Sequence, residues 1–382
     1  MKVDGVPRQT MWAEGRVIKS VDQRSLPHEF VVEDITTVHE MAVAIKDMHL
    51  RGAVVIGTAA AYGMALAACE AQAAAGEDVA KFMDLLQASG EKLKATRPTA
   101  VNLEHAVRDV LAGVTSGTVA ERVEQSWELA KVQKGHDLDW CRRIGEHGLK
   151  IIRQMSDKKG GDKTFNILTH CNAGWLACID FGTATAPMYA AHDAGIKLHV
   201  YVDETRPRNQ GASLTAWELG QHGVPHTVIA DNTGGHLMQH GMVDMVITGA
   251  DRVTRGGDVC NKIGTYLKAL AAKDNNVPFY VALPSSTLDL RLVDGFKIPI
   301  EQRSAREVSH VQGLHEETGK IMEVLLTPKS SPAANYAFDV TPRHLVTGLI
   351  TECGVHEANE AAIVAVFGNG SEEPSAKKAK VE

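Results

Sequence analysis

The sequence predicts an α/β protein in which a smaller, mainly helical N-terminal domain that begins with short β-strands precedes a doubly wound, Rossmann-like parallel sheet. Three observations predict this class. Short β-branched runs open the chain, Ala- and Leu-rich helical patterns continue to about Met155, and five apolar strand-like runs then alternate with helical segments. With 382 residues and 44% hydrophobic content, the chain is large enough for two domains.

The N-terminal part is predicted to start with strands and continue as helices. RVIKSVDQ (16–23) and HEFVVEDI (28–35) have the composition of strands. A helix is expected within residues 36–50, with Thr36 or Thr37 as its cap. Helical periodicity then recurs over residues 53–76, 78–95 and 99–114 and in a further run to about residue 155. These elements form a predicted domain of residues 1–156.

The polar cluster SDKKGGDK (156–163) is the predicted domain boundary, since it lacks periodicity and the pattern changes after it. Residues 163–368 are predicted to form the Rossmann-like domain, and residues 369–382 a disordered, polar tail. The predicted parallel strands are FNIL (165–168), KLHVYV (197–202), HTVIA (226–230), VDMVIT (243–248) and PFYVAL (278–283). The predicted helical segments between them are residues 184–195, 213–223, 235–241 and 261–274.

Polar residues follow the predicted strands. In open parallel sheets, ligands bind beyond the carboxyl ends of the strands, so these residues are expected to share one edge of the sheet. The residues expected at this edge are Cys171, Asp203, Arg206, Gln210, Asp231, Asp251, Asn261 and Lys262.

Cys171 and Asp251 each allow two interpretations. Cys171 is either a buried structural thiol or a reactive one, whose thiolate would be favoured by the N–H groups of a helix expected to follow it. Cys178 is expected inside that helix as a structural thiol. Asp251 follows an apolar strand and is either a loop cap or a partly desolvated acid with a raised pKa. Spacing alone does not separate these interpretations.

Two arginines are expected at helix starts. Arg51 and Gly52 precede a long helical run, and Arg97 in TRPTAVN precedes another. The free amides of a helix start beside an arginine can hold a phosphate, whereas the alternative is an arginine exposed to solvent. Two such arrangements favour an anion more than one does.

Charge and composition exclude several function classes. The formal net charge is -7 with both signs interspersed, which argues against nucleic acid or an anionic membrane as the main partner. No apolar run is expected to reach the roughly 18 residues of a membrane helix, and MKVDGVPRQT has no signal-peptide core. The six cysteines are expected to be reduced thiols, which predicts a cytoplasmic location. The basic segment AKKAK (376–380) allows the nucleus as a second location, through nuclear import.

Several familiar motifs are absent. The chain has no GxGxxG after a strand and no GxxxxGK[ST], so the predicted sheet need not bind a dinucleotide or ATP. The His-Glu pairs lack a second histidine four residues on, and the cysteine and histidine spacings match no zinc site. Neither a metal nor a cofactor is expected.

The chain contains a series of motifs in this order: DQRSLP, RGAVVIG, RPTAVNL, THCNAG, ETRPRNQGASLTAWEL, TGADRVTRGGDVCNKIGTY, PSSTLDL and IPIE. This series resembles the methylthioribose-1-phosphate isomerase family, which shares its architecture with the regulatory subunits of the eukaryotic translation initiation exchange factor. The departures are mild: Val54 and Val55 stand in RGAVVIG where the family usually has RGAPAIG, and Cys260 stands where alanine is more frequent.

The resemblance implies an isomerase that converts 5-methylthioribose 1-phosphate to 5-methylthioribulose 1-phosphate in methionine salvage, acting as a homodimer without metal or cofactor. It implies Cys171 and Asp251 as the catalytic pair. The hydrogen at C2 would move to C1 either as a proton taken by the Cys171 thiolate or as a hydride. The implied substrate-binding residues are Arg51, Gly52, Ala53, Arg97, Gln210, Asn261 and Lys262.

Two other functions remain open from the sequence. A ribose 1,5-bisphosphate isomerase would need additional basic groups where a methylthio group needs an apolar wall. A non-catalytic regulatory subunit would bind a protein partner or sense a sugar phosphate, and the joint presence of Cys171, Asp251, Arg51 and Arg97 argues against it.

Overall fold

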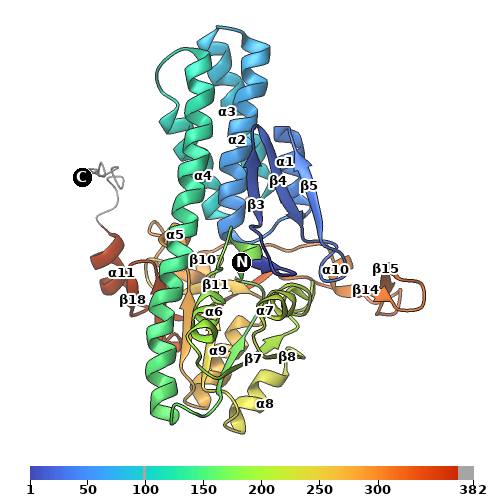
Figure 1. Cartoon of the computed structure of the whole chain (residues 1–382), viewed down its shortest axis with the longest axis vertical. Helices are drawn as coiled ribbons and strands as arrows, with labels where there is room; N and C mark the ends of the chain where they lie inside the picture. The colour runs from blue at the N-terminus through green and yellow to red at the C-terminus, as the bar shows by residue number, and fades with distance from the viewer. Residues whose placement is uncertain (98–99, 369–382) are drawn as a thin grey trace.

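The computed structural model describes residues 1–97 and 100–368, so the predicted tail at 369–382 lies outside the described part. A helical domain stands on an α/β domain (Figure 1). The first domain combines a short hairpin and a three-stranded antiparallel sheet with five helices. Its elements are β1 (Lys2–Val3), β2 (Val6–Pro7), β3 (Met11–Glu14), β4 (Val17–Asp22), β5 (Val31–Ile35), α1 (Val38–Lys46), α2 (Ala53–Ala75), α3 (Val79–Thr96), α4 (Val101–Gly113) and α5 (Val119–Lys159).

Side-chain caps fix the starts of two of these helices. Thr37 accepts a hydrogen bond from the Glu40 amide, and the Glu40 carboxylate accepts one from the Thr37 amide, which makes a complete capping box for α1. Thr118 and Glu121 form the same arrangement at α5. The prediction that a threonine caps the first helix is therefore confirmed at Thr37.

Helix α2 corrects one expectation about membranes. Among the described residues it alone is long and apolar enough to cross a membrane by length and composition, with a mean hydropathy of 1.5. The expectation that no run approaches this length was therefore wrong. However, 83% of its apolar window is buried against α3, α4 and α5. Small residues such as Ala59 and Ala60 let these helices approach closely, as expected for the central helix of a globular core.

The second domain is built on a seven-stranded sheet in the order β18-β17-β12-β9-β6-β7-β8, in which β18 alone is antiparallel. All five predicted strands belong to it, and the predicted fold class is confirmed. The last two strands at one side of the sheet, β17 and the edge strand β18, were not predicted. The strands are β6 (Phe165–Thr169), β7 (Leu198–Asp203), β8 (His226–Ile229), β9 (Met245–Thr248), β12 (Phe279–Ala282), β17 (Gly348–Thr351) and β18 (Gly354–His356). The helices that cover it include α6 (Ala186–Asp193), α7 (Ala216–His222), α8 (Thr233–Gln239), α9 (Thr265–Asp274) and α11 (Glu360–Phe367).

The strand order places the switch point of this sheet between β6 and β9. From β6 the chain proceeds outward through β7 and β8, then returns and proceeds in the opposite direction through β9, β12 and β17. Crossovers on the two sides diverge at such a point and leave a crevice at the carboxyl ends of the strands. Cys171 follows β6 and Asp251 follows β9.

A second, four-stranded sheet was not predicted. Residues 261 and 262 were expected at the start of a helical segment, but they belong to a strand of residues 259–262 that pairs antiparallel with two others, and α9 begins only after Gly264. The sheet has the order β13 (Leu288–Asp289), β10 (Arg252–Thr254), β11 (Val259–Lys262) and β16 (Phe338–Thr341). Between β13 and β16 the chain forms a short helix and a hairpin that projects from the molecule in Figure 1: α10 (Arg306–Ser309), β14 (His310–His315) and β15 (Lys320–Leu325).

Helix α5 runs along both domains (Figure 1). The predicted boundary at residues 156–163 falls at its end, and the division into residues 1–156 and 163–368 stays a prediction. Its second half packs closely on α6 through two glycines. A Cβ added at Gly148 would lie 2.3 Å from Cγ of Pro187, and one added at Gly145 would lie 3.2 Å from Cβ of Ala186.

We expect Gly148→Ala to be less stable than Gly135→Ala by about 1–3 kcal/mol, the usual cost of overpacking a close contact. Gly135 is the matched control, since it is exposed on the same helix and an added Cβ would meet nothing within 4 Å. Both changes gain the same helix propensity, so the difference isolates the contact with α6. Urea unfolding of the two variants measures it, and equal stabilities would show that α6 does not constrain this face.

Candidate active site

One cavity at the switch point contains every residue that the resemblance assigned. These residues come from the loops and elements around α2, α3, β6, β7, β9 and β11, which are far apart along the chain. The members are Arg51, Gly52, Ala53, Arg97, Cys171, Gln210, Asp251, Asn261 and Lys262.

Cys171 lies at the end of β6 in a strained backbone conformation. Its φ is 67°, in the left-handed region that non-glycine residues rarely adopt, and its amide donates to Thr205 Oγ1 at 2.8 Å. The thiol is buried and donates to Gln210 Oε1 at 3.3 Å. Burial raises the pKa of this thiol, although the nearby Arg51 and Lys262 act in the opposite direction.

The expected helix after Cys171 is wrong. A single turn, Trp175–Ala177, is followed by irregular chain, and α6 begins only at Ala186. The thiolate-stabilising helix start is therefore missing, and the expectation of a lowered thiol pKa is also wrong. Cys178 lies just after the turn rather than inside a helix, and it packs with Cys141 and Val54. Its structural role stays a prediction.

Asp251 follows β9 at the base of the cavity. Burial raises the pKa of its carboxyl, against the influence of Lys262 and the two arginines. Of the two interpretations of this residue, the geometry supports the partly desolvated acid.

Arg51 and Gly52 stand at the start of α2, as predicted. The Arg51 guanidinium is held by the residue after Cys171: Nη1 donates to Asn172 Oδ1 at 2.5 Å and Nη2 to the Asn172 carbonyl at 2.7 Å. Gly52 has a φ of 120°, and a Cβ there would lie 2.5 Å from the carbonyl oxygen of Ala177. The helix has no side-chain cap and no acidic residue in its first turn, so its first amides can bind an anion.

Arg97 reaches the cavity from a different place than predicted. It is the residue that ends α3, and α4 begins at Val101, so Arg97 does not stand at a helix start. Its side chain is 11% exposed, and its nearest carboxylate oxygen, on Glu301, is 3.9 Å from Nη2. The buried Nε has no hydrogen-bond partner among the described residues. Burial lowers the pKa of this guanidinium, and an unsatisfied buried cation is suited to an anionic ligand.

Asn261 and Lys262 enter the cavity from β11. Lys262 Nζ donates to the carbonyl of Ala337 at 2.9 Å and lies 4.5 Å from the centre of the Phe338 ring. Burial lowers the pKa of this ammonium. Asn261 Nδ2 donates to Thr265 Oγ1 at 3.0 Å, which fixes the amide at the end of the strand.

Asp203, Asp231 and Arg206, which were also expected at this edge, do not line the cavity. The Asp231 carboxylate instead orders the loop that carries Gln210. The Asp231 carboxylate accepts from the amides of Thr205 and Arg206, each at 2.7 Å. Arg206 Nη2 donates to the carbonyl of Val308 at 2.8 Å.

Asp203 belongs to a buried charged cluster behind Cys171. Its Oδ2 lies 2.7 Å from His170 Nδ1 and 3.1 Å from Lys268 Nζ. His170 Nε2 faces the carbonyl of Ile263 at 2.8 Å and must donate to it, so the ring ties the end of β6 to the segment after Lys262. His170, Asp203 and Asp231 are close enough to hold a metal ion, but the Lys268 ammonium already pairs with Asp203.

Sequence reasoning missed His170, Thr205, Lys268 and Phe338 as parts of this site. A buried ion pair between a strand end and α9 has no sequence signal, because its members lie on different elements.

Comparison with known proteins agrees with this geometry. A model of the initiation factor 2 subunit family matches residues 49–358. The methylthioribose-1-phosphate isomerase of Paramagnetospirillum magneticum is 56% identical over 370 residues, which cover 96% of this chain and 99% of the relative. The corresponding isomerase of Methylocella silvestris is 55% identical over 370 residues, covering 96% and 98%. The chain belongs to the methylthioribose-1-phosphate isomerase family.

Solved structures of the wider family share the fold. The 5-methylthioribose 1-phosphate isomerase of Pyrococcus horikoshii has a TM-score of 0.82 and 36% identity, with 95% of this chain and 96% of that chain covered. The delta subunit of translation initiation factor eIF-2B from A. fulgidus has a TM-score of 0.78 and 36% identity, with 95% and 100% covered.

We expect Arg97→Ala to weaken the binding of ribose 1-phosphate, used as a simple phosphate ester, by about 1.5–3 kcal/mol, because a charged hydrogen-bond donor is lost. Arg24→Ala is the control, since Arg24 lies in the adjoining cavity and already pairs with Asp22 at 2.7 Å. It should leave the affinity almost unchanged. Calorimetric titration measures both, and an equal effect of the two changes would remove Arg97 from the anion site.

Proposed function

We propose that this protein converts 5-methylthioribose 1-phosphate to 5-methylthioribulose 1-phosphate, an aldose to ketose isomerisation in methionine salvage. The observation that supports this proposal best is one cavity in which largely buried cations surround a half-buried carboxyl group, Asp251, and a buried thiol, Cys171. Relatives more than half identical over nearly the whole chain are isomerases of this name.

The cations suit the phosphate of such a substrate. Arg97 offers an unpartnered Nε, Lys262 offers an ammonium, and α2 offers the amides that follow Gly52. A phosphate dianion would neutralise these groups, and the low dielectric of a buried site would strengthen each contact. Gln210 and Asn261 would bind sugar hydroxyls as neutral donors and acceptors.

Asp251 would provide the acid for opening the sugar ring. Because phosphate occupies O1, the sugar cannot open to a free aldehyde, so the ring C–O bond must break with a proton delivered to the ring oxygen. A carboxyl with a raised pKa stays protonated at higher pH than an ordinary aspartate and can donate this proton. The bond then breaks to leave an oxocarbenium carbon at C1, stabilised by the phosphate-bearing oxygen.

The structure favours a hydride route for the hydrogen at C2. The Cys171 thiol has a raised pKa and donates to Gln210, so it is poorly suited to act as a thiolate base. In our proposal the Asp251 carboxylate formed by ring opening removes the C2 hydroxyl proton, while hydride passes from C2 to C1. C2 becomes the ketone, and Cys171 lines the space in which the hydride moves.

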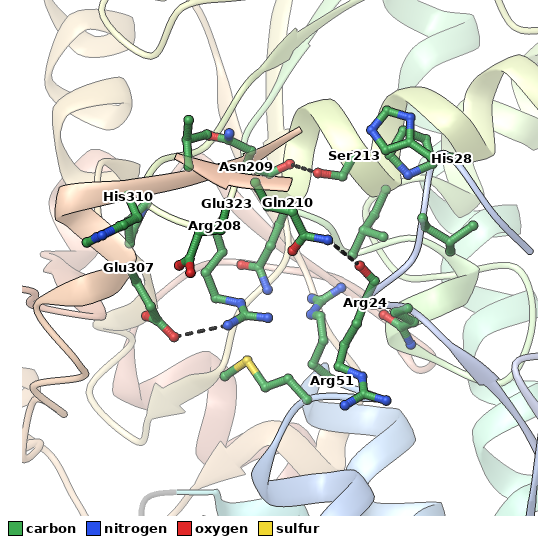
Figure 2. A pocket seen from close by; sticks show the side chains of 18 residues that line it. Arg24, His28, Arg51, Arg208, Asn209, Gln210, Ser213, Glu307, His310 and Glu323 are labelled. Atoms are coloured by element: carbon green, nitrogen blue, oxygen red, sulfur yellow. Dashed lines mark hydrogen bonds and ion pairs between the residues drawn. The ribbon is translucent and has the colours of Figure 1, made fainter. Parts of the chain in front are cut away.

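The adjoining cavity argues against ribose 1,5-bisphosphate as substrate. It shares Arg51 and Gln210 with the first cavity, and Figure 2 shows Arg24 and Arg208 among the side chains that line it. Arg208 pairs with Glu307 at 3.0 Å, and Arg24 pairs with Asp22. A second phosphate would have to displace these carboxylates, whereas a methylthio group requires no free cation.

The proposal also covers the oligomeric state of the protein and its location in the cell. We propose a homodimer located in the cytoplasm, with AKKAK, which lies outside the described residues, directing a nuclear fraction. Light scattering of the purified protein and localisation of a fluorescent fusion with and without residues 376–380 test these two points. A monomer, or a distribution unaffected by the deletion, would contradict them.

One experiment tests both the reaction and its route. Purified protein is given 5-methylthioribose 1-phosphate carrying deuterium at C2, with ribose 1,5-bisphosphate as the competing substrate, in ordinary water. We expect a ketose from the first compound only, with the deuterium retained at C1. Asp251→Asn should lower kcat by about 10²-fold or more, while Cys178→Ser should change it little. Turnover of the bisphosphate alone would contradict the function, and loss of the label to water would contradict the hydride route.

A further inference from the structure

A buried glutamate stands behind the cavity wall without a cation in direct contact among the described hydrogen bonds and ion pairs. Glu218 on α7 is fully buried, and its Oε1 accepts from the amide of Leu176 at 2.8 Å. Its Oε2 accepts from the hydroxyl of Tyr189 at 3.1 Å. The backbone packs directly on this carboxylate, since a Cβ added at Gly174 would lie 1.6 Å from Oε2. Such a site is costly for a carboxylate and calls for an explanation beyond packing.

Glu218 reaches the cavity through Asn172. Asn172 Nδ2 donates to Glu218 Oε1 at 3.1 Å and to Thr215 Oγ1 at 3.2 Å. The hydroxyl of Thr215 itself donates to the carbonyl of Cys171 at 2.7 Å, so it faces Asn172 as an acceptor. Both neighbours of the NH₂ group are therefore acceptors, and they fix which end of the amide is oxygen.

The fixed oxygen is the one that Arg51 contacts. With Nδ2 turned to Glu218, Oδ1 of Asn172 accepts from Arg51 Nη1, and the Asn172 carbonyl accepts from Nη2. A flipped amide would place an NH₂ group against the guanidinium and leave two donors facing each other. The guanidinium plane would then lose one of its two holding contacts.

We propose that Glu218 is a positioning residue that orients Arg51 for the phosphate by fixing the amide of Asn172. The inference rests on the proposed role of Arg51 as a phosphate ligand. In this proposal Glu218 acts through the position of Oε1, which accepts the hydrogen bond from Asn172 Nδ2. The net charge of Glu218 is not the proposed means, because Asn172 stands between the Glu218 carboxyl group and Arg51 and bonds to both.

Two substitutions separate reach from charge. Glu218→Gln keeps Oε1 within reach of Asn172 and Leu176 and removes the charge, with its NH₂ group able to donate to Tyr189. Glu218→Asp keeps a carboxyl group but shortens the side chain by one methylene, which moves the carboxyl group away from Asn172. On the full chain, calorimetry with ribose 1-phosphate should show affinity within about threefold of the unchanged protein for Glu218→Gln and a loss of about tenfold for Glu218→Asp. The opposite order would overturn the inference in favour of a charge effect.

A double-mutant cycle tests whether the effect passes through Arg51. In an Arg51→Ala background, Glu218→Asp should cost less than about threefold further, because the group being positioned is gone. An undiminished loss there would show general damage to the loop and overturn the inference. Tyr189→Phe removes a partner of Glu218 on the side away from Asn172 and should leave the affinity within about threefold.

A measurement without ligand keeps this inference separate from the proposed function. The Nη protons of Arg51, observed by ¹⁵N NMR in the free protein, should exchange slowly with water in the unchanged protein and in Glu218→Gln, and faster in Glu218→Asp. Equal exchange in all three would overturn the positioning role, even if the isomerase assay succeeds. Failure of the unchanged protein to bind any sugar phosphate would instead refute the proposed function.

Discussion

The site depends on the burial of charged side chains where the helical domain meets the ends of β6 and β9. Arg51 and Arg97 come from the helical domain and Lys262 from the four-stranded sheet, and all three side chains are largely buried. Buried cations are costly unless they are paired or hydrogen-bonded. Arg51 and Lys262 reach carbonyl or amide oxygens, while Arg97 keeps a buried Nε without a partner. The anion that completes this arrangement is the proposed phosphate.

The same burial raises the pKa of the acidic groups, whereas burial lowers the pKa of cationic side chains. At Asp251 and Cys171 burial raises the pKa although neighbouring cations lower it, so the proton-bearing form of each group persists to higher pH than in water. A site with fewer cations would not hold a phosphate, and a wetter site would ionise Asp251. The backbone closes on the site at Gly52, which lies against Ala177 where no side chain would fit.

The fold was largely predictable because its signals are local. The apolar runs of β6, β7, β8, β9 and β12 and the periodic helices are read directly from the chain, and the rule for strand ends then brings Cys171 and Asp251 together. The resemblance supplied the substrate-binding set, all of which lines the cavity.

What could not be predicted depends on contacts between distant segments. Residues 259–262 form a strand only because β10 and β16 pair with them, since a run of four residues has no periodicity of its own. Arg97 was assigned to a helix start because a helical pattern follows it in the sequence, but α3 ends at Thr96 and α4 begins only at Val101. The pKa of Cys171 was predicted in the wrong direction because its burial comes from the loop around Thr205 and Gln210. Glu218 gave no sign of being buried, since a glutamate in a short helix is usually exposed.

Burial and neighbouring cations act on the pKa of Asp251 in opposite directions, and a direct titration measures which of the two prevails. The free protein is labelled with ¹³C at its aspartate carboxyl groups, and the Asp251 resonance is assigned by its loss in Asp251→Asn. The account predicts a midpoint above the ordinary value of 3.8, and a still higher one in Lys262→Met, where the leading opposing cation is removed. A midpoint at or below 3.8 in the unchanged protein would show that the cations outweigh burial and would contradict Asp251 as the acid that opens the ring.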